Sequence, residues 1–218
     1  MKILLHICCA PCALYTVDKL RQDGQEVEGY FYNPNIAPFA EYKLRRKAVV
    51  EMARRMNLKI HYRDERLFKK FPSPHRGACP PKPKAKGEGK GEGDKRSGEE
   101  IKLSMPCSQP ALVVAKPQRC ANCWWMRLSE TAKAAKQAGV DAFSTTLLIS
   151  PYQNHKEIRI IGSELEREVK VNFYYDDFRP GFRRSQQMAK EQGLYRQKYC
   201  GCEFSIEEAQ TPITRGQV

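Results

Sequence analysis

The sequence contains no apolar run that approaches the ~18 residues of a membrane-spanning helix. It also has no N-terminal segment with the charged, apolar and small-residue regions of a secretory signal peptide. The cysteines number nine, which is odd, so a secreted protein held by structural disulfides is not expected. A chain of 218 residues can bury an apolar core without such bonds. We therefore expect a reducing, cytoplasmic setting, where paired cysteines more often bind metal or carry out redox chemistry.

Negative charge is also scarce. Asp and Glu number 25 against 38 Lys and Arg, which gives a formal net charge of +13. A positive field attracts phosphate backbones, so a nucleic acid is a candidate partner. The basic residues are spread along the chain, and simple solubility is the alternative explanation.

Three thiols stand where an apolar strand, Lys2–Ile7, gives way to a helix. They are Cys8, Cys9 and Cys12, and Pro11 between them suits the first turn of a helix, where its missing N–H costs nothing. The exposed N–H groups and the positive end of the helix dipole favour thiolate over thiol. This position predicts metal ligands or a redox nucleophile.

A second cysteine pair has the spacing of a metal site. Cys120 and Cys123 repeat the Cys-x-x-Cys spacing of Cys9 and Cys12, and two such pairs are typical of a structural zinc. An iron–sulphur cluster also takes four thiolates, or three with one open iron. A zinc site leaves Cys8 unexplained, so we favour a cluster with a neighbouring redox or metal site.

Cys200 and Cys202 are a separate signal. A disulfide across one residue closes a small, strained ring that is easily reduced, and Gly201 permits unusual backbone angles. Such a pair can store two electrons; two incidental buried thiols are the alternative.

Strands and helices are predicted to alternate, which is typical of an α/β fold with a parallel, doubly wound sheet. Ligand sites in such sheets lie at the carboxyl ends of the strands. Because His6–Cys12, Asn33–Asn35 and Ser150–His155 each follow a predicted strand, we expect these turns to meet at one edge. The predicted strands are Lys2–Ile7, Val27–Tyr32, Lys59–Tyr62, Asp141–Ile149 and Val171–Tyr175, and the predicted helices are Ala13–Leu20, Glu41–Met56, Glu65–Phe71, Trp124–Gln137, 154–169 and Ser185–Glu191.

Two predicted helices bear on the site. Cys123 is expected at the N-terminus of the helix Trp124–Gln137, whose predicted apolar side is Trp125, Leu128, Ala132 and Ala135. In the helix Glu41–Met56 the predicted stripe is Leu44, Ala48, Met52 and Met56. The basic residues of that helix lie largely off the stripe and are interpreted as a solvated face; they are Arg45, Arg46, Lys47, Arg54 and Arg55.

Composition changes abruptly after Phe71. Pro, Gly, Lys and Glu dominate to about residue 100, and such a segment cannot bury enough apolar surface to order itself. We predict one α/β domain from residues 1–71 and 120–210, a flexible insertion at 72–119 with Cys79 and Cys107 near its ends, and a tail at 211–218.

Two histidines adjoin the predicted turns. His6 shares a strand face with Cys8, and a hydrogen-bonded core histidine is its simpler interpretation. His155 is better placed for a substrate.

Five ordered motifs together resemble the cobalamin-independent epoxyqueuosine reductases, the QueH family. The resemblance runs nearly end to end. The motifs are His6-x-Cys8-Cys9-Ala10-Pro11-Cys12, Tyr32-Asn33-Pro34-Asn35-Ile36, Arg119-Cys120-x-x-Cys123 with Arg127-Leu128, Thr145-Thr146-Leu147 with Ser150-Pro151, and Tyr195-Arg196-Gln197-x-Tyr199-Cys200-Gly201-Cys202.

The resemblance implies an oxidoreductase that removes the epoxide oxygen from epoxyqueuosine in tRNA to leave queuosine. It implies an adenine-nucleotide-hydrolase-like α/β fold and a 4Fe–4S cluster held by Cys8, Cys9, Cys120 and Cys123. Its redox-active pair falls on Cys200 and Cys202, and its partners are the tRNA and an unidentified electron donor. Cys12, with Asp177, is our candidate for holding an adjacent mononuclear iron.

Two alternatives come from other classes. A tRNA-thiolating enzyme of related fold needs a glycine- and serine-rich pyrophosphate loop after the first strand, where this chain has cysteines and proline. A zinc-dependent RNA-binding module without catalysis explains the charge and most cysteines, but not the pair Cys200 and Cys202.

Overall fold

A computed structural model describes residues 1–64 and 116–210. Its centre is a five-stranded sheet in the order β3-β2-β1-β4-β5, and every adjacent pair runs parallel. The predicted α/β class with a parallel sheet is therefore confirmed. The strands are β1 (Lys2–His6), β2 (Glu26–Phe31), β3 (Ile60–Tyr62), β4 (Ala142–Thr145) and β5 (Asn172–Phe173).

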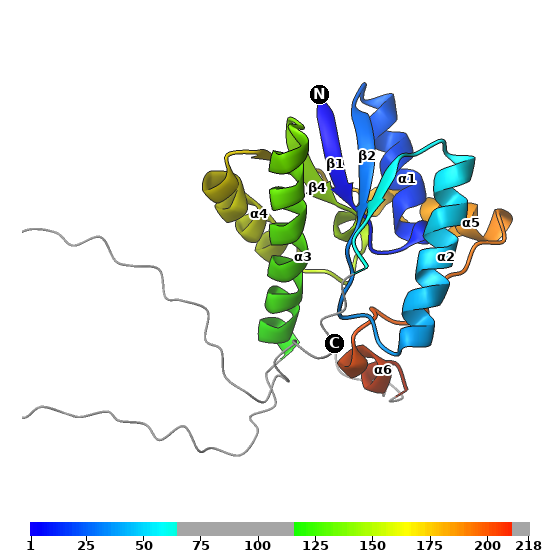
Figure 1. The fold of residues 1–218 in the computed structure, drawn as a ribbon. Helices are drawn as coiled ribbons and strands as arrows, with labels where there is room; N and C mark the ends of the chain where they lie inside the picture. The colour runs from blue at the N-terminus through cyan, green and yellow to red at the C-terminus, as the bar shows by residue number, and fades with distance from the viewer. Residues whose placement is uncertain (65–115, 211–218) are drawn as a thin grey trace, which may run out of the picture.

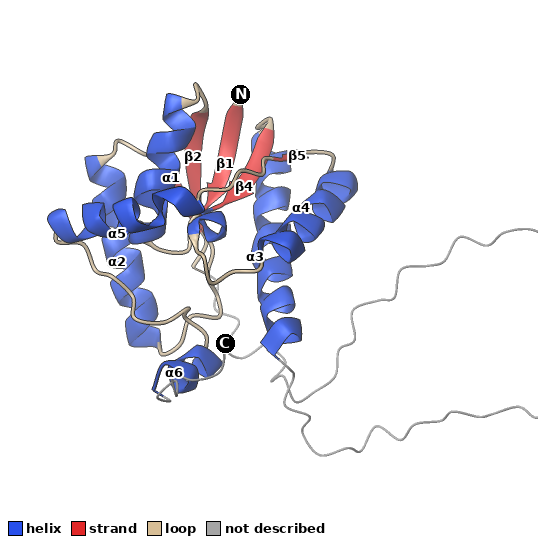
Figure 2. Ribbon diagram, turned by 180° about the vertical axis from the view of Figure 1, so that it is seen from behind, coloured by secondary structure: helices blue, strands red, loops and turns tan. Residues whose placement is uncertain are grey.

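Helices cover both faces of this sheet. Figures 1 and 2 show α1, α2 and α5 to one side, and α3 and α4 to the other. The helices are α1 (Ala10–Gln22), α2 (Phe39–Arg55), α3 (Lys116–Ala138), α4 (His155–Val169), α5 (Phe182–Glu191) and α6 (Glu203–Gln210), with short 3-10 turns η1 (Thr146–Ile149) and η2 (Arg179–Gly181). Within the described residues no helix is long and apolar enough to cross a membrane.

The middle strand accounts for the position of the core. Ile3, Leu4 and Leu5 are almost fully buried on alternate faces of β1, as expected for a strand covered by helices on both sides. Because β2 and β4 flank β1, the chain crosses from one half of the sheet to the other there. Ligand sites of doubly wound sheets lie at the carboxyl edge of such a crossover, and the turn after β1 carries the three N-terminal thiols.

Helix α3 begins earlier than predicted. It starts at Lys116, so residues 116–119 of the predicted insertion are helical, and Cys120 and Cys123 lie within the helix rather than at its N-terminus. Pro117 suits a first helical turn, and the next residues contain no glycine that would end a helix. The predicted apolar side was also wrong at one position, because Trp125 is 40% exposed and Trp124 is buried.

In the predicted stripe of α2, Ala48 and Met52 are buried as predicted, but Leu44 is not. Leu44 is 45% exposed, whereas Arg45 is 1% exposed, so the interpretation of Arg45 as part of a solvated face was wrong. Helical spacing identifies a buried face but not the hydrogen bonds that allow a charged side chain to occupy it.

Two further predictions differ in extent or fall outside the structure. The predicted strand Asp141–Ile149 ends at Thr145, where the Thr145 hydroxyl accepts from the N–H of Leu147 and begins η1. Asn154 caps α4 as predicted, with its side chain accepting from the N–H of Glu157. The predicted helix Glu65–Phe71 lies outside the described residues.

Candidate metal and redox centre

The turns that follow β1, β2 and β4 meet at the carboxyl edge of the sheet, as predicted. The N–H of Cys8 donates to Thr146 Oγ1 at 3.1 Å, which ties the thiol turn to η1. The side chain of Asn33 donates to the carbonyl of Ile7 at 2.8 Å, which ties the same turn to the loop after β2. These two hydrogen bonds hold the backbone of the turn that carries Cys8 and Cys9.

Cys8, Cys9 and Cys12 form one buried group. Their sulphur atoms all lie within 4.8 Å of one another, and the Sγ atoms of Cys8 and Cys9 are 3.6 Å apart. Cys9 occupies the N-cap of α1 without capping it through its side chain. The thiols therefore lie beside the unpaired N–H groups of a helix start, where negative charge is stabilised. A single metal ion can reach all three sulphur atoms.

This group favours one thiolate. Hydrogen bonds from Cys12 and then Cys9 lower the pKa of Cys8 well below its ordinary value, and the Thr146 hydroxyl also donates to its sulphur at 3.3 Å. Burial raises the pKa of Cys9, and the hydrogen bond to Cys8 raises that of Cys12. A metal that binds all three sulphur atoms must displace the protons that the thiols carry.

Gln197 reaches this group from the C-terminal part of the chain. Its Nε2 donates to Cys9 Sγ at 2.9 Å and lies 3.8 Å from Cys12 Sγ. Its Oε1 is buried and has no hydrogen-bond partner among the described residues. Gln197 lies within a cysteine motif, three residues before Cys200, and this position is the one signal in the sequence for its contact with the thiols.

The thiol of Cys123 approaches from α3. Its sulphur accepts a hydrogen bond from Asn35 Nδ2 at 3.2 Å, and burial raises its pKa. The Asn35 Oδ1 accepts from Nη2 of Arg127 at 2.7 Å, and Arg127 is only 2% exposed. Cys120 is partly buried one turn earlier on the helix. Asn35 therefore links a thiol to a buried positive charge.

Cys200 and Cys202 are free thiols beside this helix. Neither forms a disulfide, and Cys200 Sγ lies 3.9 Å from Gln153 Nε2. The thiol of Cys202 donates to Ser205 Oγ at 3.6 Å. Gly201 has a φ of +129°, a backbone conformation that side chains with a Cβ rarely adopt.

Two residues predicted near the thiols have other partners in the structure. Asp177 is exposed and forms an ion pair with Arg179, which lowers the pKa of Asp177 to about 2, and it does not belong to the group of three thiols. His6 is a core histidine, as predicted. Its ring nitrogens lie 3.0 Å from Thr145 Oγ1 and 3.1 Å from the carbonyl of Tyr32, and burial lowers its pKa to about 4.

His155 and Trp124 border the site. The His155 Nδ1 lies 3.4 Å from the hydroxyl of Tyr175, and a role of His155 toward a substrate stays a prediction. The indole N–H of Trp124 donates to Gln153 Oε1 at 2.8 Å, so a buried aromatic ring fixes the residue beside Cys200.

Comparison with known proteins gives one consistent result. The family model "Epoxyqueuosine reductase QueH" matches residues 3–83 and 109–208, and the unmatched stretch between them lies within the predicted insertion. Three curated proteins with that name are similar over nearly the whole chain. The protein from Thermotoga maritima is 34% identical over 94% of this chain and 91% of its own length. The protein from Dehalococcoides mccartyi is 31% identical over 95% of this chain and 93% of its own length. The protein from Staphylococcus epidermidis is 32% identical over 94% of this chain and 76% of its own length.

Proposed function

This chain belongs to the epoxyqueuosine reductase QueH family and is an oxidoreductase, and we propose that it reduces the epoxide of epoxyqueuosine in tRNA to the alkene of queuosine. The observation that carries the proposal is the buried group of Cys8, Cys9 and Cys12 at the carboxyl edge of the sheet. The thiols of Cys8, Cys123, Cys200 and Cys202 all lie near enough to the buried guanidinium of Arg127 to act on it.

The donor set fits a 4Fe–4S cluster. Thiolates are the ligands that such clusters take, and we propose Cys8, Cys9, Cys120 and Cys123 for this role. When bound, the cluster would supply electrons one at a time. Gln197 would then donate a hydrogen bond to the sulphur of a ligand, because its Nε2 lies 2.9 Å from Cys9 Sγ.

Cys12 lies in the buried group with Cys8 and Cys9 but is not one of the four proposed ligands. We propose that it holds a mononuclear iron next to the cluster, with Asp177 as the second candidate ligand. Asp177 pairs with Arg179 in this structure, so that pair must open before Asp177 can bind a metal.

Cys200 and Cys202 together could supply the electrons and protons that the reaction consumes. Removal of an epoxide oxygen as water consumes two electrons and two protons. Oxidation of two thiols to one disulfide releases two electrons and two protons, so an epoxide and a dithiol give an alkene, a disulfide and water. An external donor must then reduce the disulfide. Cys200 is exposed, which supports a role in which its thiol meets a substrate or a donor.

The net positive charge of the chain would attract the phosphate backbone of the RNA. At +13 the chain favours phosphates in general, and we propose that the modified base turns out of its stack to bring its epoxide to the thiols.

Anaerobic purification tests the cofactor first. We expect about four iron and four sulfide per chain, with visible absorbance that bleaches with dithionite. Iron in excess of sulfide would support the mononuclear site. A colourless protein with zinc alone would contradict the proposal and favour the RNA-binding module.

Cysteine variants then test the assignments. Cys8→Ser should lose iron, whereas Cys200→Ser should keep iron but fail in a single turnover with an epoxyqueuosine-containing anticodon stem-loop. Cys79→Ser is the matched control and should keep both iron and activity. Loss of iron from Cys79→Ser would contradict the four-ligand set, and full single-turnover activity in Cys200→Ser would remove the dithiol from the reaction.

A further inference from the structure

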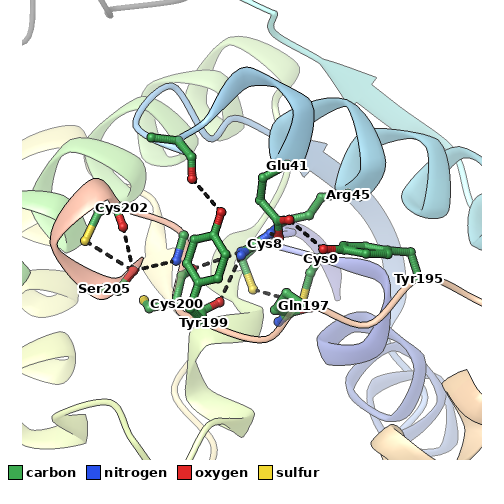
Figure 3. Close-up of polar contacts among 12 residues, drawn as sticks. Cys8, Cys9, Glu41, Arg45, Tyr195, Gln197, Tyr199, Cys200, Cys202 and Ser205 are labelled. Carbon is green, nitrogen blue, oxygen red and sulfur yellow. Dashed lines mark hydrogen bonds and ion pairs between the residues drawn. The ribbon is translucent and has the colours of Figure 1, made fainter. Parts of the chain in front are cut away.

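Arg45 is a buried arginine at the centre of a hydrogen-bond network that joins α2 to the C-terminal thiols (Figure 3). It is 1% exposed, and its Nε donates to Glu41 Oε1 at 2.7 Å. Its Nη1 donates to the carbonyl of Cys200 and its Nη2 to that of Tyr199, each at 2.9 Å. One guanidinium thus fixes two successive peptide groups at the redox pair.

The rest of the network holds the same segment, Tyr195–Cys202, which we call the strap. The Tyr195 hydroxyl donates to the second oxygen of Glu41 at 2.5 Å. The Tyr199 hydroxyl donates to the carbonyl of Ala37 at 2.7 Å, and the N–H of Ala37 donates to the carbonyl of Gly201 at 2.8 Å. The strap is therefore attached to α2 and the loop before it at both ends, with Gln197 between the attachments.

Gly201 allows the guanidinium to come this close. A Cβ at this position would lie 3.0 Å from Arg45 Nη1 and would carry the unfavourable φ of +129°. The glycine between the two cysteines is thus explained by the approach of Arg45 as well as by its backbone angle.

A buried ion pair is a costly way to hold a loop. The desolvation of Arg45 and Glu41 offsets most of their attraction, and apolar residues of similar volume often stabilise a fold as well or better. What apolar residues cannot do is orient carbonyl groups. The specific effect of this pair is the placement of the strap.

We propose that Arg45 is a positioning residue that holds Cys200 and Cys202 in the dithiol geometry and places Gln197 against the N-terminal thiols. The redox part of this proposal rests on the proposed function. In the structure the two thiols have different neighbours, since Cys202 contacts Ser205 and Cys200 lies near Gln153. A disulfide between them would replace the contact of Cys202 with Ser205 and constrain the peptide that Arg45 holds. Release of the strap therefore favours the disulfide.

The thiol–disulfide equilibrium of the full chain measures this directly. Oxidised glutathione takes the two electrons and two protons of the dithiol and becomes two molecules of reduced glutathione. Trypsin separates the three thiol groups, because cleavage at Lys and Arg places Cys200 and Cys202 alone in peptide 199–215, Cys8–Cys12 in peptide 3–19 and Cys120 with Cys123 in peptide 120–127. Mass spectrometry after alkylation then reports the Cys200–Cys202 disulfide by itself.

Arg45→Lys keeps the charge but cannot donate to Glu41 and both carbonyls in the same planar geometry. We expect the equilibrium constant for oxidation of its dithiol by glutathione to be about tenfold larger than in the parent chain. This factor corresponds to the free energy of one lost charge-assisted hydrogen bond. Arg54→Lys is the matched control. Arg54 lies on the same helix but is exposed and pairs only with Glu51 among described residues, so its equilibrium should equal that of the parent.

Tyr199→Phe is a second, milder variant, which keeps the ring over Arg45 and removes only the hydroxyl contact with Ala37. Tyr199→Phe should shift the thiol–disulfide equilibrium toward the disulfide by a smaller factor than Arg45→Lys. If Arg45→Lys does not fold, Tyr199→Phe alone tests the positioning role of the network. An unchanged equilibrium in the variants, or a shift toward the dithiol, overturns the proposal. Iron content and turnover are recorded in parallel. A shifted equilibrium in a chain without reductase activity would refute the proposed function while leaving the positioning role of Arg45 intact.

Discussion

Asn35 offers a test of how the site is supported, because one side chain serves a buried charge and a thiol. Asn35→Ala removes the acceptor for Nη2 of Arg127, 2.7 Å away, and the donor to Cys123 Sγ, 3.2 Å away. The guanidinium is 2% exposed, so little water can replace the lost partner. One hydrogen bond to a buried charge contributes about 1.5–3 kcal/mol, and the bond to sulphur adds little. We expect the free energy of unfolding to fall by about 2 kcal/mol.

Urea unfolding of the metal-free chain, followed by circular dichroism, measures this difference if the slope with urea is unchanged. Asn122→Ala is the control, since Asn122 is exposed on α3 and accepts only a 3.3 Å contact from the exposed Gln118 among described partners. It should change stability by less than about 0.5 kcal/mol. An equally small effect for Asn35→Ala would refute the view that Arg127 depends on Asn35.

Asn35→Asp separates the two roles. A carboxylate keeps an acceptor for Arg127, so stability should stay within about 1 kcal/mol of the parent. The same carboxylate replaces an N–H donor at Cys123 with negative charge, which should raise the pKa of a thiol already raised by burial. Slower alkylation of peptide 120–127 at neutral pH would confirm this, and an unchanged rate would contradict it.

Three further predictions concern the fold around the site. Gly162→Ala places a Cβ 2.1 Å from the Phe173 ring, so urea unfolding should show a loss of about 1–3 kcal/mol. Hydrogen bonds from His61, the largest contributor, and from Lys2 and Lys59 lower the pKa of Glu28 from 4.5 to about 2. The ionised carboxylate therefore stabilises the folded state above pH 4.5, and this stabilisation is lost as the pH falls toward 2. Glu28→Gln should therefore flatten stability against pH within that window. Asp177→Asn breaks only an exposed ion pair and should change stability by less than about 1 kcal/mol, while a lower iron content would support Asp177 as a metal ligand.

The sheet and the place of the thiol turn could be predicted because both depend on local pattern. The continuous apolar run of β1 is typical of a strand buried on both faces, and Pro11 fixes where the next helix begins. Asn154 gave the start of α4 in the same way, through the one side-chain contact that an N-cap makes.

The burial of Arg45 could not be predicted from such patterns. Its carbonyl partner at Cys200 is 155 residues away, and a basic residue without a known partner is correctly interpreted as exposed in most helices. The prediction of where α3 begins was wrong for a related reason. Composition identified a segment poor in apolar residues, but the last residues before Cys120 carry the proline and helix formers of a first turn.

The contact between Gln197 and Cys9 joins residues 188 positions apart. As the chain leaves the ribosome, the first three thiols emerge long before the strap that covers them and before the pair Cys200 and Cys202. The thiols of the N-terminal turn and of α3 have both been made once synthesis passes Ala138, but the strap begins only at Tyr195. If the proposed cofactor binds, the strap would enclose it only at a late step of maturation, and a chain truncated before Tyr195 would lack the contact of Gln197 with Cys9.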